Sequence, residues 1–233
     1  MKNDIEADVR TDSGIRVMAL FFVAIIVLAV TTDPISTGTK VGERAPALEG
    51  MMYNGSGWTT FEMDDYISNN WTAEDTTSEW LLIEFMDTDC PFCVRSASEM
   101  GQNADYFMKI AKNSDGTPAW PGPVVNFIAS ATQLDIQGHD TSRDEIKAFR
   151  DRTGGEDCAG YSCGDQQELG PAHNFIYIDD IDQENMDSWK VPGTPAYFLI
   201  QPDGIVAWTS ADSQQEKVSD GIFRIMNEQG MIS

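Results

Sequence analysis

Basic residues are scarce in this sequence. Its 233 residues include 15 lysines and arginines against 38 aspartates and glutamates, which gives a net charge of −23. Because a strongly acidic surface repels the phosphate backbone, this balance excludes nucleic acid as a partner. Two interpretations of the acidity stay open: solubility in a salty habitat, and electrostatic steering of cationic client proteins.

Patterns of metal ligands are also missing. The sequence has two histidines and four cysteines: His139, His173, Cys90, Cys93, Cys158 and Cys163. Neither histidine has ligand spacing, and only the first cysteine pair has the C-x-x-C spacing of a zinc half-site, without a second half to complete it. We therefore assign no metal ligands, no cofactor and no role to either histidine.

The sequence lacks internal repeats and low-complexity tracts. A length of 233 residues and a hydrophobic content of 41% predict one packed domain with extensions. We expect an N-terminal tail at 1–16, an apolar segment at 17–32, a linker at 33–44 and a folded domain at 45–233. A glycine-rich insertion at about 154–171 interrupts that domain.

A single long apolar run lies near the N-terminus. No charged residue occurs from Val17 to Val30, which with its flanks is near the lower limit for a transmembrane helix. Arg10 and Arg16 before the run favour an N-terminus inside the cell, although basic residues after it weaken that bias. The absence of a small-residue cleavage site near position 30 favours an uncleaved signal anchor over a cleaved signal peptide.

The most informative stretch runs from Leu81 to Cys93. An apolar strand at 80–86 is followed by an acidic turn and by Cys90-Pro91-Phe92-Cys93. Proline is favoured at the first position of a helix, so Cys90 is predicted at the positive end of a helix dipole, where a thiolate is stabilised. Cys90 is the candidate nucleophile and should be the more exposed thiol. Cys93, one turn inside, is the candidate resolving thiol, and a structural disulfide or a zinc half-site is the alternative.

A second motif follows about a hundred residues later, where Val191-Pro192-Gly193-Thr194-Pro195 leads into an apolar strand. Together, the two motifs resemble the thioredoxin superfamily over roughly residues 45–230, and the membrane-tethered TlpA/ResA-like branch in particular. The resemblance implies an α/β fold in which helices flank a central mixed β-sheet. The patterns predict strands at 80–86, 124–130, 175–178, 196–200 and 205–209, helices at 91–112, 141–153, 183–190 and 212–229, and a hairpin turn at 54–57.

The resemblance also implies roles for individual residues. Glu84 matches a buried acid that accepts the proton of the resolving thiol, and burial should raise its pKa. The Thr194-Pro195 bond matches a cis peptide that presents the backbone of Thr194 to an extended client, with Phe92 as a further substrate-binding residue. The alternatives are a strand glutamate that faces a polar pocket or solvent, and an ordinary trans proline.

The sequence also departs from the family pattern. Asp89 replaces the tryptophan that usually precedes the first cysteine, and carboxylates there should raise the pKa of Cys90. Phe92 replaces a proline or histidine, and Ser98 replaces a proline that kinks the helix. These changes leave the redox potential and the direction of electron flow open.

The second cysteine pair, Cys158 and Cys163, lies in the insertion. A disulfide across so short a loop is worth about 2 kcal/mol on a chain-entropy model. We expect a structural clip, and a second redox-active pair is the alternative. Two close pairs behind an export signal suit an oxidising compartment.

The sequence therefore predicts a membrane-anchored, extracytoplasmic thiol–disulfide oxidoreductase. Its partners would be protein clients with thiols or disulfides, the membrane through the N-terminal helix, and an upstream redox partner. The rival hypothesis is a non-catalytic binding or assembly module of the same fold with a structural disulfide. A secreted form after signal cleavage is the alternative location.

Overall fold

The computed structural model describes residues 2–31, 35–136, 138–153, 171–213, 215–232 of the chain. It divides the chain into two compact units, residues 1–36 and 37–233. The folded unit thus includes residues from Thr37, before the predicted start at 45. Cys158 and Cys163 lie outside the described residues, so their predicted disulfide stays a prediction.

The N-terminal unit consists of one long helix, α1 (Lys2–Thr31). Most of its large apolar side chains that are described, among them Leu20 and Phe21, are more than half exposed. Within the described part of the chain, no helix combines the length and the apolar character that crossing a membrane requires. The helix is present, but the membrane span predicted at 17–32 is not confirmed.

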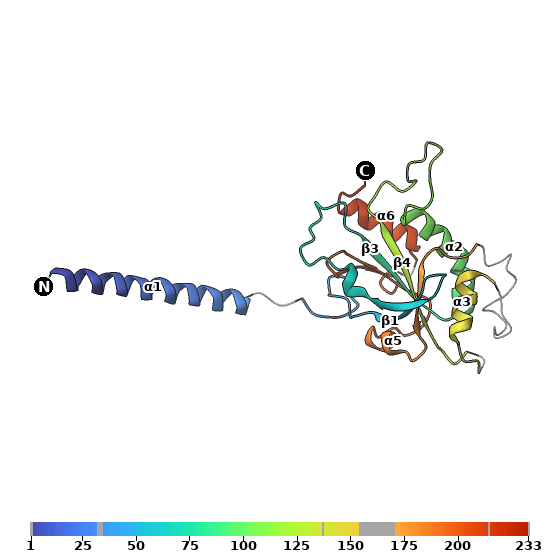
Figure 1. The fold of residues 1–233 in the computed structure, drawn as a ribbon, viewed down its shortest axis with the longest axis horizontal. Coiled ribbons are helices and arrows are strands. Elements are labelled where there is room, and N and C mark those ends of the chain that lie inside the picture. Colours follow the sequence, from blue (N-terminus) through green and yellow to red (C-terminus); the bar gives the residue numbers. More distant parts are fainter. Residues whose placement is uncertain (1, 32–34, 137, 154–170, 214, 233) are drawn as a thin grey trace. The chain divides into compact units, whose positions relative to one another are not determined.

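The second unit is built on one mixed sheet of seven strands (Figure 1). The strands are β1 (Glu49–Tyr53), β2 (Trp58–Glu62), β3 (Trp80–Met86), β4 (Val125–Thr132), β5 (Ile176–Asp180), β6 (Ala196–Ile200) and β7 (Val206–Thr209). Their order is β2-β1-β5-β4-β3-β6-β7. The buried strand β3 is central, with β4 parallel on one side and β6 antiparallel on the other. A parallel pair joined through a helix and followed by an antiparallel hairpin is the thioredoxin-like arrangement that the sequence predicts.

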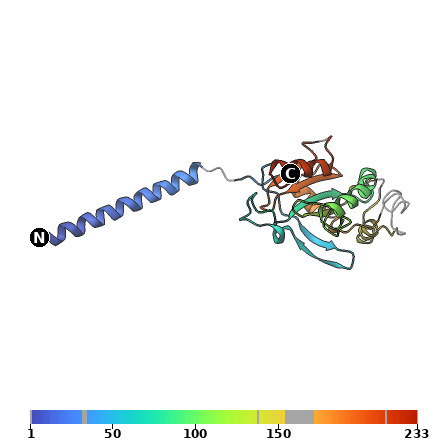
Figure 2. The same cartoon turned by 90° about the horizontal axis from the view of Figure 1, so that it is seen from above.

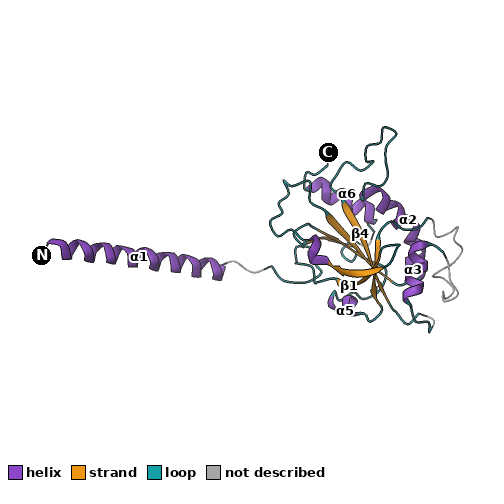
Figure 3. Ribbon diagram, viewed as in Figure 1, coloured by secondary structure: helices purple, strands orange, loops and turns teal. Residues whose placement is uncertain are grey.

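Helices cover both faces of this sheet (Figure 3). They are η1 (Met63–Tyr66), α2 (Pro91–Phe107), α3 (Arg143–Asp151), α5 (Glu184–Ser188) and α6 (Val218–Glu228). Apolar residues of α2, α3 and α6 share one core cluster with alternate residues of β3, while η1 and α5 contribute to the cluster on the other face. In Figure 2 the red helix α6 lies beside the orange strands of the C-terminal hairpin.

Strand periodicity decides which face each residue of β3 serves. Trp80, Leu82 and Met86 belong to the cluster that contains α2, whereas Leu81 and Phe85 belong to the cluster on the opposite face. Because side chains alternate along a strand, Glu84 falls on the face of Leu82 and Met86, the face that α2 covers.

The helix ends differ from the predicted ones. Helix α2 stops at Phe107 rather than near residue 112, because Lys109 adopts a left-handed backbone conformation and Lys112 pairs with Pro118. Helix α3 begins where the Ser142 hydroxyl accepts a hydrogen bond from the backbone of Glu145, and ends at a left-handed Arg152. Helix α6 begins at Val218 rather than at 212. The predicted hairpin turn at 54–57 joins β1 to β2.

Candidate functional site

The first cysteine lies at the N-terminus of α2. Cys90 is the N-cap residue, with an extended backbone, and Pro91 follows as the first helical residue. The Cys90 thiol donates a hydrogen bond to the Thr194 carbonyl oxygen at 3.3 Å. Both thiols are buried, with 4% of Cys90 and 1% of Cys93 exposed, so the expected difference in exposure is small. The described structure holds both cysteines as free thiols.

The two thiols have opposite acidities. Hydrogen bonding with Cys93 is the largest influence that lowers the pKa of Cys90 to about 5, and the side chain of Thr194 lowers this pKa further. The sequence predicted that neighbouring carboxylates would raise this pKa, but the pKa is lowered, and the influence that opposes the lowering is burial. Burial raises the pKa of Cys93 well above its ordinary value, and the nearby Cys90 and Glu84 add to that rise. Cys90 is therefore a thiolate at neutral pH, whereas Cys93 keeps its proton.

Glu84 lies in the middle of β3, directly opposite Tyr197 of β6. Only 4% of the residue is exposed, and burial raises the pKa of its carboxyl to about 7. Hydrogen bonding to Tyr197 and the positive charge of Arg152 oppose that rise without cancelling it. A carboxyl with this pKa exchanges a proton readily near neutral pH. Its charge also reaches Cys93, since Glu84 contributes to the raised pKa of that thiol.

A buried polar network beside Glu84 has no counterpart in the sequence predictions. His173 is buried, with its Nε2 at 2.9 Å from the Ala97 carbonyl oxygen of α2 and its Nδ1 at 2.6 Å from the Tyr177 hydroxyl. The guanidinium of Arg152 contacts the same imidazole and lies over the Phe149 ring. Burial, with the charge of Arg152, lowers the pKa of His173 to about 3, so this imidazole is neutral.

The Thr194–Pro195 peptide bond is cis and lies beside the thiols, as the hydrogen bond from Cys90 to Thr194 shows. Phe92 is 62% exposed next to them, and the guanidinium of Arg95 lies 4.5 Å from the centre of its ring. The structure thus brings together five of the residues predicted from sequence: Glu84, Cys90, Cys93, Thr194 and Pro195. A sixth, Phe92, offers an apolar side chain at the surface of the site.

The sequence assigned no role to two further side chains near the start of α2. Asp87 follows β3 and is fully buried, where its carboxylate accepts hydrogen bonds from the backbone of Asp89 and of Leu134. His139, to which the sequence assigned no role, lies with Nδ1 at 2.6 Å from a carboxylate oxygen of Asp89. No spacing rule could indicate this contact, because about fifty residues separate the partners.

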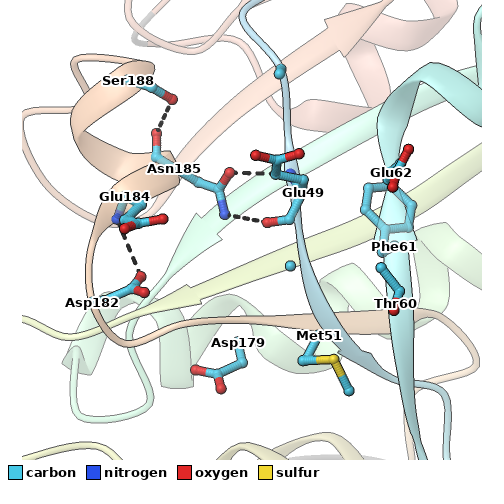
Figure 4. Close-up of a pocket in the computed structure, with 12 residues that line it drawn as sticks. Glu49, Met51, Thr60, Phe61, Glu62, Asp179, Asp182, Glu184, Asn185 and Ser188 are labelled. Carbon is cyan, nitrogen blue, oxygen red and sulfur yellow. Dashed lines mark hydrogen bonds between the residues drawn. The ribbon is translucent and has the colours of Figure 1, made fainter.

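A separate pocket of about 590 Å³ lies between β1, β2 and α5 (Figure 4). Five carboxylates line it: Glu49, Glu62, Asp179, Asp182 and Glu184. The side chain of Asn185 bonds to both backbone groups of Glu49 and so joins α5 to β1. No residue of the predicted site lines this pocket, so the acidic groove and the thiols are distinct features.

Searches with family models and against curated proteins find no match for this chain. Solved structures do resemble it. A putative thiol:disulfide interchange protein DsbE from Chlorobium tepidum is 17% identical, with 81% of this chain and 99% of that chain covered and a TM-score of 0.48. MTB dsbF, in its mixed oxidized and reduced forms, is 14% identical over 78% of this chain and 94% of that one, with a TM-score of 0.46.

The mitochondrial 2-cys peroxiredoxin of Plasmodium falciparum is 11% identical over 83% of this chain and 99% of that chain, with a TM-score of 0.48. Likenesses at this level assign no activity to the present chain. The strand order, the cysteine pair at the tip of α2 and the adjacent Thr194–Pro195 bond define the fold as thioredoxin-like, in agreement with the superfamily resemblance of the sequence.

Proposed function

We propose that this protein is a thiol–disulfide oxidoreductase that exchanges disulfides with client proteins through Cys90 and Cys93. The carrying observation is the contrast between the two thiols. Cys90 has a pKa of about 5 at the tip of α2, while burial keeps Cys93 protonated one turn further along. An attacking thiolate and a protected resolving thiol are what disulfide exchange requires.

The exchange proceeds in two substitutions at sulfur. The Cys90 thiolate attacks one sulfur of a client disulfide, forms a mixed disulfide and releases the other client sulfur as a thiolate. Cys93 then passes its proton to the Glu84 carboxylate and attacks the Cys90 sulfur, which releases the second client thiolate. The client gains two electrons and the Cys90–Cys93 pair loses two. The same steps in reverse oxidise a client dithiol.

Client binding is assigned to the surface around the thiols. Thr194 and Pro195 adjoin the reacting sulfur, since the Thr194 carbonyl oxygen lies 3.3 Å from the Cys90 sulfur. An extended client segment would pair with the backbone there in the manner of an added strand. The exposed ring of Phe92, two residues after Cys90, supplies apolar contact.

The location is proposed from the N-terminal segment. The uncharged run at 17–30, whose described side chains are exposed in α1, would anchor the protein and leave residues 45–233 outside the cytoplasm. An upstream thiol–disulfide partner would then restore the Cys90–Cys93 pair after each turnover. Protease added to intact cells should degrade the folded domain, and complete protection would contradict this location.

Insulin reduction by the full chain tests the activity. Cys90→Ser should abolish turnover, whereas Cys93→Ser should accumulate a mixed disulfide between Cys90 and insulin, because the resolving thiol is gone. A variant with Cys158→Ser and Cys163→Ser provides the matched control, and should keep its turnover. If Cys90→Ser turns over like the wild type, the mechanism is wrong.

The rival hypothesis, a binding or assembly module, is favoured by one observation: both thiols are almost fully buried. A disulfide between Cys90 and Cys93 would then be structural. Resistance of that disulfide to a strong dithiol would support the module, and rapid reduction would support the enzyme.

A further inference from the structure

The two acidic side chains nearest to His139 come from distant parts of the chain. Asp89 precedes α2, His139 lies in the loop between β4 and α3, and Glu145 belongs to the first turn of α3. The His139 Nδ1 atom lies 2.6 Å from an oxygen of Asp89 and 3.8 Å from an oxygen of Glu145. One ligand atom from each of the three residues lies within 4.8 Å of the other two.

Burial makes this cluster unusual. The side chains of Asp89 and Glu145 are 5% and 0% exposed, while that of His139 is 28% exposed and leaves the cluster open to solvent on one side. Buried carboxylates are costly unless a cation or a metal ion compensates them. The Asp89 Oδ1 atom is buried and has no hydrogen-bond partner in the described part of the chain, so ligand capacity is left over inside the cluster.

Two basic residues of α3 near Glu145 form ion pairs with other carboxylates. Arg143 and Lys147, the basic residues of α3 closest in sequence to Glu145, bind Asp179 and Asp144 respectively. The loop around the cluster is held in place by Asp87, whose carboxylate bonds to the backbone of Leu134. The cluster is thus positioned by groups that are not themselves candidate ligands, as is usual around metal sites.

From this arrangement we propose that Asp89, His139 and Glu145 bind a divalent first-row transition-metal ion. One imidazole and two carboxylates are donors that Zn²⁺ and Mn²⁺ accept, and three protein ligands leave a position for water. With bonds of about 2.0–2.2 Å at tetrahedral angles, the ligand atoms would lie about 3.4 Å apart. Binding therefore requires the 2.6 Å contact between Asp89 and His139 to open and the more distant ligand atoms to approach, each by about an ångström. The ion replaces the hydrogen bond between Asp89 and His139.

Such an ion would tie the loop after β3 to the N-terminus of α3. It shares no ligand with the thiol pair, so the test is independent of the proposed function. We choose Mn²⁺ as the probe because this ion prefers oxygen and imidazole ligands to thiolates, which keeps the cysteines out of the measurement.

The experiment is a Mn²⁺ titration of the full chain, followed by loss of the electron paramagnetic resonance signal of the free ion. The matched pair is Glu145→Gln and Asp144→Asn, which remove the same charge from adjacent positions. Asp144 is 76% exposed and serves as the control for weak binding to an acidic surface. Glu145→Gln should weaken the saturable site by about tenfold or more, and Asp144→Asn by less than about twofold.

A second measurement begins with the wild-type protein. Bound Mn²⁺ in the wild-type protein should show magnetic coupling to a nitrogen nucleus, and His139→Ala should remove that coupling. The only other histidine is His173, which is buried with both ring nitrogens engaged. The proposal is overturned if the wild type has no saturable site or if bound Mn²⁺ shows no nitrogen coupling. It is also overturned if Glu145→Gln and Asp144→Asn weaken Mn²⁺ binding equally.

Discussion

Two carboxylates on the same sheet differ in how far they are buried. Glu49 begins β1 at the rim of the acidic pocket, where its side chain is exposed and joins four other carboxylates (Figure 4). Glu84 lies in the middle of β3, buried between α2 and the sheet, and the pKa of its carboxyl is raised to about 7. Position in the sheet, rather than residue type, turns a solvated charge into a group that exchanges protons near neutral pH.

The two thiols also differ in pKa, and the largest expected effect is the difference in their rates of alkylation. In the reduced protein at pH 7, iodoacetamide should label Cys90 at least about a hundredfold faster than Cys93, because only Cys90 is a thiolate. Mass spectrometry of the labelled peptides gives both rates, and the rate of Cys90 should rise through a midpoint near pH 5. Equal labelling of the two cysteines would contradict the contrast.

Stability should depend on pH through Glu84. Its pKa is about 7 in the folded state and about 4.5 when unfolded, so its contribution is complete below about pH 4.5 and is lost as the pH rises through 7. The loss amounts to about 3 kcal/mol in the free energy of unfolding. Urea unfolding at pH 4 and pH 8 measures it, and Glu84→Gln should lack this component of the change.

Glu49→Gln is the control for that measurement. It removes the same charge from the acidic pocket, and its difference from the wild type should stay within about 0.5 kcal/mol at both pH values. If the free energy of unfolding changes with pH in the same way in Glu84→Gln and in Glu49→Gln, burial does not distinguish the two carboxylates.

Substitutions of Glu84 and Glu49 should also have different effects on the rate of disulfide exchange. Glu84→Gln should slow the resolving step about tenfold or more, because Cys93 loses its proposed proton acceptor, while Glu49→Gln should leave the rate unchanged. Single-turnover release of thiol from a preformed mixed disulfide isolates this step. In the wild type the rate should rise with pH through about 7, as the Glu84 carboxyl ionises.

The smallest effect concerns Tyr197. Its hydrogen bond lowers the pKa of Glu84, so Tyr197→Phe should move the midpoint of the resolving step upward by less than about one pH unit. Single-turnover rates across the pH range provide the measurement. A downward movement would mean that Tyr197 acts on the carboxyl in another way than by hydrogen bonding.

Local patterns predicted the parts of the site that are contiguous in sequence. Short sequence patterns identify the apolar strand, the helix start after Cys90 and the turn before Thr194. The thioredoxin-like fold then places these segments next to one another. The contact between Arg152 and His173 has no such signal, because it depends on how α3 and β5 pack. The end of α2 was missed for a different reason: Lys109 adopts a left-handed conformation that the pattern of apolar residues does not reveal.

The alternation of side chains along β3 also limits how the protein can change. Inserting or deleting one residue between Glu84 and the end of the strand would rotate the carboxylate to the face of Phe85 and Trp189, away from the sulfurs. Surface loops tolerate changes of length, but this short segment can vary only in composition. The number of residues in this segment therefore fixes whether the Glu84 carboxyl and the two sulfur atoms lie on the same face of the sheet.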